Sequence, residues 1–340
     1  MRGGFHVFAL ASLGLSAACA TIPAMGDPAV AVQAVVETEP VGTANEDAAD
    51  DPAIWNNAGD PAASLIVATD KKGGLYVYGL DGRIRSFHAQ PGLNNVDLVD
   101  MGPGNVVVFA SDRSDLANAK IALFRLDTAS AKLAPLGTIA SGSGEAYGIC
   151  GYRRADGALV VFTAPKEGNI GEWQVSLDGA PSATRLRAMQ VPSQPEGCAV
   201  DPRNGTLYIG EEAGGIWRFA PGQTDGELAV RVDGRKLVAD LEGLALVPEG
   251  SDGGWLYASS QGDNAYMRFR LPDLAPAGRF RIAEGTLGST EETDGIEAMR
   301  GDFGPGFPGG LFVAQDGVNG TAAQNFKIVP LGTIESALEN

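Results

Sequence analysis

The stretch Asp50-Asp51-Pro52-Ala53-Ile54-Trp55, followed by Asp70-Lys71-Lys72-Gly73-Gly74, contains the unit from which the fold can be predicted. Two adjacent carboxylates stand just before one apolar strand, and two adjacent ammonium groups stand just after the next. Carboxylates in such a position suit a hard divalent cation, and lysines suit an anion that the cation also contacts. These two short strands therefore predict a binding site at one of their ends.

Similar units recur along the 340-residue chain, each with a polar anchor, an apolar strand, a turn and a second apolar strand that ends in polar residues. The six anchors are 46 to 52 residues apart: Asp51, Asp97, Tyr147, Glu196, Glu242 and Asp294. The second strands begin at Leu65, Val106, Leu159, Leu207, Trp255 and Leu311. Several short strands in each such period are typical of propeller blades. The prediction is an all-β, six-bladed β-propeller, with a closing strand over 328–334 and a frayed tail over 336–340.

The first 20 residues have the pattern of an export signal: Arg2, an apolar run from Phe5 to Leu15, and the A-x-A-like site Ala18-Cys19-Ala20. We therefore expect residues 1–20 to be a signal peptide and residues 21–340 to be a single propeller domain. The mature protein would be exported to the periplasm or the extracellular space. The alternative is lipidation at Cys19, which would make it an outer-membrane lipoprotein.

Signal removal changes the formal charge from −17 to −18, because it deletes Arg2 and no acidic residue. The chain is strongly acidic and has no large basic patch, which argues against nucleic acid as a partner. It also argues against membranes, apart from a lipid anchor at Cys19. A monomer is the default expectation. The remaining cysteines, Cys150 and Cys198, lie in apolar strand-like runs, and the sequence leaves open whether they form a bridge or remain buried thiols.

In a propeller, equivalent strand ends meet on one face around the central channel, so the polar ends of the repeats should become neighbours. The expected anionic set is Asp50, Asp51, Asp97, Glu196, Glu211, Glu212, Asp240, Glu242, Asp294 and Asp316. Carboxylates packed so closely repel one another unless cations lie between them. Calcium accepts oxygen ligands from separate loops with tolerant geometry. Because the mature chain has a single histidine, His88, zinc and iron are disfavoured, and we expect several calcium ions.

The expected cationic set is Lys71, Lys72, Arg113 and Lys166, which follow the second strands of blades 1 to 3. Taken singly, each could be a surface ion-pair partner of little consequence. Taken together beside bound metal ions, which reverse the local field, they resemble a receptor for a phosphate-rich ligand. The sequence has no cysteine-phosphatase loop, Arg-His-Gly motif, G-x-S-x-G elbow or P-loop, which leaves metal-assisted attack by water.

Ten motifs in order, covering residues from about 35 to 330, closely resemble the β-propeller phytases. They are Asp50-Asp51-Pro52-Ala53-Ile54-Trp55, Lys71-Lys72-Gly73-Gly74, Asn94-Asn95-Val96-Asp97, Ala110-Ser111-Asp112-Arg113-Ser114, Pro195-Glu196-Gly197, Glu211-Glu212, Asp240-Leu241-Glu242-Gly243-Leu244, Ser259-Ser260-Gln261-Gly262, Thr293-Asp294-Gly295-Ile296 and Val313-Ala314-Gln315-Asp316-Gly317. The resemblance implies a calcium-dependent phosphoric monoester hydrolase of the 3-phytase type. Its substrate would be phytate, myo-inositol hexakisphosphate, taken as a calcium complex and attacked by water that calcium activates.

The resemblance also assigns roles to individual residues. By motif, the calcium ligands are Asp50, Asp51, Tyr147, Glu196, Glu211, Asp240, Glu242 and Asp294. The phosphate-binding cations are Lys71, Lys72, Arg113 and Lys166, and Tyr147 and Glu211 complete the catalytic set. Two further interpretations stay open: a calcium-dependent propeller hydrolase of another ester, such as a lactonase, and a non-catalytic binding propeller. A neutral ester would give the four cations nothing to bind, which argues against the lactonase.

Overall fold

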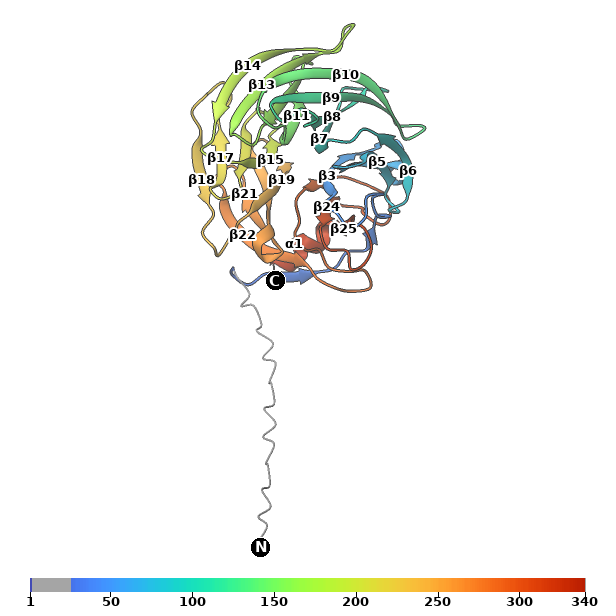
Figure 1. Cartoon of the computed structure of the whole chain (residues 1–340), viewed down its shortest axis with the longest axis vertical. Coiled ribbons are helices and arrows are strands. Elements are labelled where there is room, and N and C mark those ends of the chain that lie inside the picture. Colours follow the sequence, from blue (N-terminus) through green and yellow to red (C-terminus); the bar gives the residue numbers. More distant parts are fainter. Residues whose placement is uncertain (2–25, 340) are drawn as a thin grey trace.

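The computed structural model describes residue 1 and residues 26–339, whose strands form six sheets arranged as the blades of a ring (Figure 1). This confirms the predicted six-bladed β-propeller. The predicted signal peptide after Met1 and the candidate lipidation site Cys19 lie outside the described residues. In the part of the chain that the structure describes, no helix combines the length and the apolar character needed to cross a membrane.

The blades follow one another in chain order, and consecutive strands within a blade pair antiparallel. Blade 1 contains β3 (Ala49–Trp55), β4 (Leu65–Asp70), β5 (Gly74–Gly79) and β6 (Ile84–Ala89), and blade 2 contains β7 (Leu93–Asp100), β8 (Val106–Asp112), β9 (Asn118–Asp127) and β10 (Lys132–Ser143). Blade 3 contains β11 (Gly148–Arg153), β12 (Leu159–Ala164), β13 (Asn169–Ser176) and β14 (Ser182–Gln190), and blade 4 contains β15 (Pro195–Val200), β16 (Leu207–Glu211), β17 (Gly215–Phe219) and β18 (Glu227–Arg231).

The last two blades also incorporate strands from the beginning of the described chain. Blade 5 contains β19 (Leu241–Glu249), β20 (Gly253–Ser260), β21 (Ala265–Arg270), β22 (Ala275–Ile282) and the parallel strand β1 (Val30–Val32), and blade 6 contains β23 (Ile296–Met299), β24 (Leu311–Asp316), β25 (Asn325–Pro330) and the antiparallel strand β2 (Val36–Glu37). The segment that carries β1 and β2 therefore joins the two blades and closes the ring.

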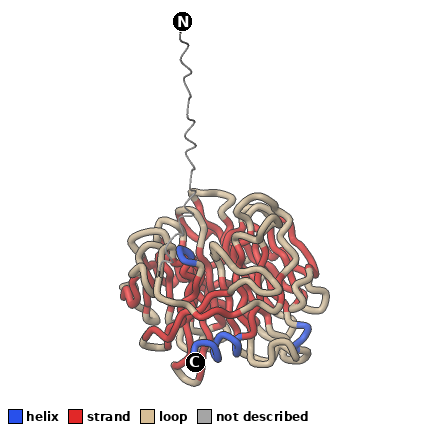
Figure 2. Tube along the Cα trace, turned by 90° about the horizontal axis from the view of Figure 1, so that it is seen from below, coloured by secondary structure: helices blue, strands red, loops and turns tan. Residues whose placement is uncertain are grey.

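The end of the chain differs from the prediction. The predicted closing strand over 328–334 is wrong beyond Pro330, because the backbone turns there into the helix α1 (Leu331–Glu339), which also replaces the expected frayed tail. Leu331 and Ile334 bury the apolar side of this helix against blades 5 and 6. The described part of the chain also contains two short 3₁₀ helices, η1 (Pro61–Ala63) and η2 (Gln261–Asp263), and these and α1 are small features of a body made of strands and loops (Figure 2).

The position of a strand within its blade explains its sequence. The first strands, including β3, β7, β11, β15 and β19, lie nearest the centre of the ring (Figure 1). The second strands β4, β8, β12 and β24 are buried along their whole length, because neighbouring blades cover both of their faces, and they read as continuous apolar runs. The outer strand β14 is mostly exposed. Six apolar clusters fill the spaces between adjacent blades.

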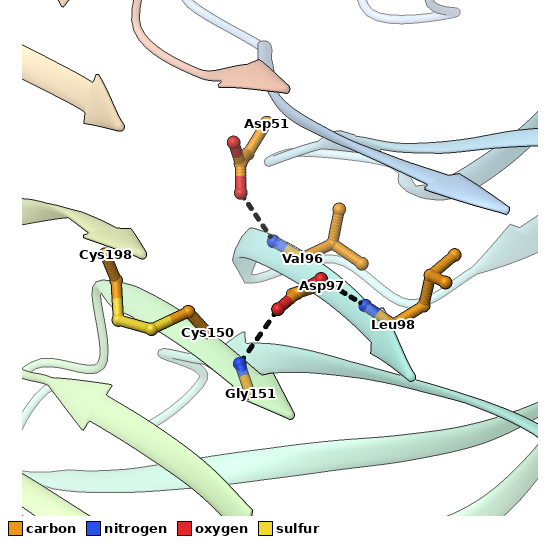
Figure 3. The surroundings of a disulfide bond; sticks show 7 residues. All are labelled: Asp51, Val96, Asp97, Leu98, Cys150, Gly151 and Cys198. Carbon is orange, nitrogen blue, oxygen red and sulfur yellow. Dashed lines mark hydrogen bonds between the residues drawn. A yellow bond between two sulfur atoms is a disulfide. The ribbon is translucent and has the colours of Figure 1, made fainter. Parts of the chain in front are cut away.

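A disulfide bond joins Cys150 and Cys198, which the sequence left open (Figure 3). It connects β11 of blade 3 with β15 of blade 4, and the two Cα atoms are 5.4 Å apart. The bridge closes a loop of 48 residues, for which the chain-entropy model gives a stabilisation of about 4 kcal/mol. It also joins the strand that directly follows Tyr147 to the strand that contains Glu196.

A fully buried lysine, Lys327, links the strands that close the ring. Its ammonium nitrogen in β25 pairs with the carboxylate of Glu37 in β2 and lies 3.2 Å from Oδ2 of Asp316 in β24. Removing one partner of a buried ion pair is costly, because the other charge stays buried without compensation. The pairing of β2 with blade 6 therefore depends on this ammonium group.

We predict that Lys327→Met lowers the free energy of unfolding by about 3–5 kcal/mol, since Asp316 would then be a buried carboxylate without a cation. Chemical denaturation monitored by circular dichroism measures the change. The matched control is Lys236→Met, which removes a lysine from a half-exposed pair with Asp233 and should cost less than about 1 kcal/mol. Equal effects of the two substitutions would contradict the proposed importance of Lys327.

Candidate active site

The predicted site residues come from strand ends at one end of the central channel. In each blade the beginning of the first strand pairs with the end of the second, as Ala49 does with Asp70 in blade 1 and Pro195 with Glu211 in blade 4. An antiparallel hairpin thus places the anchor and the polar residues after the second strand at the same edge. This geometry explains why residues about 50 positions apart in sequence can form one site.

Three glutamates from blades 4 and 5 form the most compact acidic group. Glu196 lies in β15, Glu212 follows β16, and Glu242 lies in β19; one carboxylate oxygen of each is within 4.8 Å of the others. Glu196 and Glu242 are buried, and Glu212 is half-buried. One oxygen of Glu242 has no hydrogen-bond partner in the described part of the chain. The group can supply oxygen ligands to one metal ion.

A second acidic group surrounds Lys71. Its ammonium nitrogen lies 3.5 Å from Oδ1 of Asp50, 3.2 Å from Oδ2 of Asp294 and 2.8 Å from Oδ1 of Asp47. Burial alone would lower the pKa of Lys71, but these three carboxylates outweigh it and raise the pKa above its ordinary value. Lys71 is therefore held charged. Asp50 is fully buried, and neither of its oxygens accepts a hydrogen bond from any residue that the structure describes.

Burial and mutual repulsion raise the pKa values of several of these carboxyl groups. Burial, followed by the charge of Asp50, raises the pKa of Glu196 from 4.5 to about 7. Burial and the charge of Glu196 raise the pKa of Glu242, and burial raises that of Asp294 although Lys71 opposes it. The carboxylates of one group thus affect those of the other, so the two groups form a single electrostatic unit.

The donor set fits a hard divalent cation. The converging atoms are carboxylate oxygens, with the phenol of Tyr147 close enough to Glu196 for its hydroxyl to lower the pKa of that carboxyl. Such a set suits calcium or magnesium rather than zinc or copper. The unpartnered oxygens of Asp50 and Glu242 are those that a cation would satisfy. We conclude that this end of the channel can hold at least one hard metal ion.

Two of the predicted cations lie together beside the acidic groups. Arg113 Nη1 and Lys166 Nζ lie 3.3 Å and 3.4 Å from the same oxygen, Oε1 of Glu145. Lys166 also stands 4.4 Å from the centre of the Tyr147 ring, a cation–π contact. Arg113 donates a hydrogen bond to Asn94, and the Asn94 amide donates to Glu196. The cationic pair is thus connected to the glutamate group through Asn94 and Tyr147.

Other predicted residues lie elsewhere or face different partners. Asp97 was expected at the channel mouth, but it lines a cavity of about 450 Å³ along the inner strands and accepts hydrogen bonds from the backbone N–H groups of Leu98 and Gly151 (Figure 3). Burial raises its pKa to about 7. Asp316 was also expected at the mouth, but it pairs with Lys327 in blade 6. Lys72 is exposed to solvent and does not share the buried position of Lys71.

The remaining predicted ligands have individual surroundings. Asp51 accepts a hydrogen bond from the Val96 N–H in the channel, and burial followed by the charge of Asp50 raises its pKa (Figure 3). Glu211 is buried and accepts hydrogen bonds from the Ser193 hydroxyl and the Trp217 indole. Asp240 is exposed just before β19. Their assignment as metal ligands stays a prediction.

Sequence reasoning missed the roles of three acidic residues. Glu212 was expected in the anionic set but was not among the predicted calcium ligands, and it joins the compact glutamate group. Asp47 and Glu145 were not singled out, although Asp47 contacts Lys71 and Glu145 contacts both Arg113 and Lys166. Their signal was their position: Asp47 precedes the Asp50-Asp51 anchor by a few residues, and Glu145 precedes Tyr147 by two.

The raised carboxyl pKa values predict how the stability of the metal-free protein depends on pH. The folded state binds the proton of Glu196 more tightly than the unfolded state does, so protonation of Glu196 stabilises the fold. This stabilisation is complete below pH 4.5 and is lost as pH rises through about 7. We expect the free energy of unfolding measured in a chelator to decrease from pH 5 to pH 7 by on the order of 2 kcal/mol for this group, and the thermal midpoint to decrease with it. Glu196→Gln should reduce the slope; a flat profile in the unmodified protein would contradict the prediction.

The likeness to solved structures supports the fold. The chain matches a structure described as the PQQ-bound aldose sugar dehydrogenase from Streptomyces coelicolor with a TM-score of 0.53 and 12% identity, covering 87% of this chain and 98% of that one. It matches a chain of a mitotic checkpoint complex with a TM-score of 0.51 and 11% identity, covering 92% and 82%. At this level of identity the matches concern the fold alone.

Two sequence comparisons agree on the family. The chain is 37% identical over 318 residues to the 3-phytase of Bacillus subtilis (strain 168). The aligned residues cover 88% of this chain and 83% of that protein. The model of the Phytase family matches residues 6–340. Because both matches span nearly the whole chain and include the strand ends that form the site, this protein is a phytase and belongs to the Phytase family.

Proposed function

We propose that this phytase releases phosphate from myo-inositol hexakisphosphate, with calcium as its metal ion and water as the attacking nucleophile. The observation that carries the proposal is the convergence of Glu196, Glu212 and Glu242 within 4.8 Å, connected through Asn94 to the Arg113 and Lys166 pair. A site that combines oxygen ligands for a hard cation with two side-chain cations suits a phosphate ester, whose oxygens both can bind.

When bound, calcium would supply charge neutralisation of the carboxylates and polarisation of the phosphate and the attacking water. The residues of the chain supply the binding geometry. Arg113 and Lys166 come from adjacent blades, and both would donate hydrogen bonds to phosphate oxygens. The proposed ligands are the three glutamates and Tyr147, with Asp50, Asp51, Glu211, Asp240 and Asp294 as further members of the acidic set, so that several calcium ions could bind.

The two lysines after β4 would have different tasks. Lys71 is buried among Asp47, Asp50 and Asp294, where its ammonium group compensates their charges and holds them in place. Lys72 is exposed and would be free to bind a neighbouring phosphate of the same substrate. A neutral ester, such as a lactone, would leave Lys72, Arg113 and Lys166 without a substrate group to bind.

Export to the periplasm or the extracellular space is consistent with the Cys150–Cys198 disulfide, since such bonds persist in oxidising compartments. We propose that phytate arrives as a calcium complex, because bare phytate would be repelled by a chain with a formal charge of −17. A monomer is proposed as the working unit.

The direct test is phosphate release from phytate by the purified protein, with calcium and with a calcium chelator. We expect release that stops on chelation and returns when calcium is restored, because the glutamate group needs a cation to bind the phosphate. Full activity in the chelator would contradict calcium dependence. Calcium binding without release from any inositol phosphate would favour a binding propeller.

A second test separates the two adjacent glutamates of blade 4. Glu212→Gln should raise the calcium concentration needed for half-maximal activity by about ten- to a hundredfold, because it removes a charge from the compact metal group. Calcium titrations of phosphate release measure this shift. Glu227→Gln is the matched control, since it makes the same change in an exposed pair with Arg218. An unchanged calcium requirement in Glu212→Gln would contradict its place among the ligands.

A further inference from the structure

Glu145 occupies the position between the two cations that the proposed function assigns to phosphate. Its Oε1 atom is 3.3 Å from Arg113 Nη1 and 3.4 Å from Lys166 Nζ. The side chain of Glu145 is 20% exposed, that of Arg113 21% and that of Lys166 29%, so solvent reaches all three. A carboxylate and a phosphate accept hydrogen bonds from the same donors. Glu145 therefore satisfies both cations before any phosphate arrives.

The backbone around Glu145 is anchored, whereas its carboxylate is held only through the ion pairs that the structure shows. The N–H of Glu145 donates to both carboxylate oxygens of Glu167, at 3.3 Å and 3.1 Å, and the carbonyl of Glu145 accepts a hydrogen bond from the N–H of Lys166. The loop is thus fixed next to blade 3, while the partly exposed side chain can turn about its own bonds. Glu145 differs in this respect from the buried Glu196 and Glu242.

We infer that Glu145 is an internal competitor of phosphate: the substrate phosphate displaces its carboxylate from Arg113 and Lys166, and the carboxylate returns when the product leaves. This inference rests on the proposed function, since it requires that these two cations bind phosphate. After displacement the carboxylate stays near the bound phosphate, and two like charges at such a distance repel each other. Glu145 therefore weakens the hold of the site on phosphate.

Glu145 weakens the binding of the product, inorganic phosphate, more than that of the substrate, phytate. Inorganic phosphate binds at one position only, so competition with Glu145 weakens all of its binding. Phytate carries further phosphates that other groups, such as the exposed Lys72, can bind. Glu145 thus determines the preference of the site for a polyphosphorylated substrate over inorganic phosphate and favours product release.

A purely structural role for Glu145 predicts the opposite sign. If its carboxylate served to hold Arg113 and Lys166 in position, removing its charge would loosen both cations and weaken the binding of phosphate. If it competes, removing its charge strengthens that binding. Glu145→Gln separates the two cases because glutamine keeps the size of the side chain and one acceptor oxygen but removes the charge.

The experiment compares the unmodified protein, Glu145→Gln and the control Glu227→Gln at saturating calcium. The measured quantities are the inhibition constant of inorganic phosphate, and kcat and KM for phytate. We expect inorganic phosphate to inhibit Glu145→Gln about tenfold more strongly, since a partly exposed charge next to the bound anion is removed. KM for phytate should fall by a smaller factor, and the control should match the unmodified protein. An inhibition constant that is unchanged or higher in Glu145→Gln would overturn the inference.

Calorimetric titration with inorganic phosphate in the presence of calcium keeps this test independent of turnover. Tighter phosphate binding by Glu145→Gln supports the inference, and equal or weaker binding overturns it, whether or not the protein hydrolyses phytate. The proposed function fails instead if the unmodified protein releases no phosphate with calcium. The calcium requirement of Glu145→Gln should stay unchanged, because Glu145 lies outside the group of Glu196, Glu212 and Glu242; a large shift in it would make Glu145 part of the metal site and overturn its role as a competitor.

Discussion

Repulsion between buried carboxylates is the physical constraint on which the site depends. Asp50, Glu196, Glu242 and Asp294 lie at one end of the channel, and the pKa shifts of the last three show that burial opposes their ionisation. Such an arrangement persists only if the surrounding structure prevents the side chains from moving apart. The closed ring provides this rigidity, because each blade packs against two neighbours through an apolar cluster.

The same constraint explains how an acidic protein can bind a phosphate ester. The formal charge of −17 would repel such a ligand over the whole surface, but the field at the site is set locally. Arg113 and Lys166 stand at the border of the acidic groups, and Lys71 lies within them. A bound divalent cation would change the sign of the potential where the phosphate has to lie. Specificity for anionic substrates would then depend on the metal, which couples binding to its availability.

The sequence predicted the architecture well because blade periodicity is a property of strands. The spacing of anchors such as Asp51 and Glu196 reflects the length of four strands and their turns, and this length is nearly constant along the chain. It also predicted Glu196, Glu242, Arg113 and Lys166 at one site, since the ends of antiparallel hairpins share an edge. The resemblance to the phytases gave the activity.

Other details depend on contacts that no local pattern records. Asp97 lies deeper than predicted because successive side chains in a strand alternate direction, and its place in β7 turns it toward the inner cavity. The partner of Asp316 is Lys327 in the neighbouring strand, so it does not reach the mouth. The contact of Glu145 with two cations depends on how three loops approach one another. The helix α1 replaced the predicted end of a strand because Leu331 and Ile334 are buried between two blades.

The closure of the ring by β2 has a consequence for the order of folding during synthesis. The Thr38 hydroxyl accepts a hydrogen bond from the N–H of Phe326, 288 residues further along the chain. At ribosomal rates of about 5–20 residues per second, the first segment waits roughly 15 to 60 s for its partner. Until the last strands of blades 5 and 6 have formed, β1 and β2 have no partner and stay open to pairing with other strands. The seam where β1 and β2 join blades 5 and 6 is therefore the place most prone to mispairing before the ring closes.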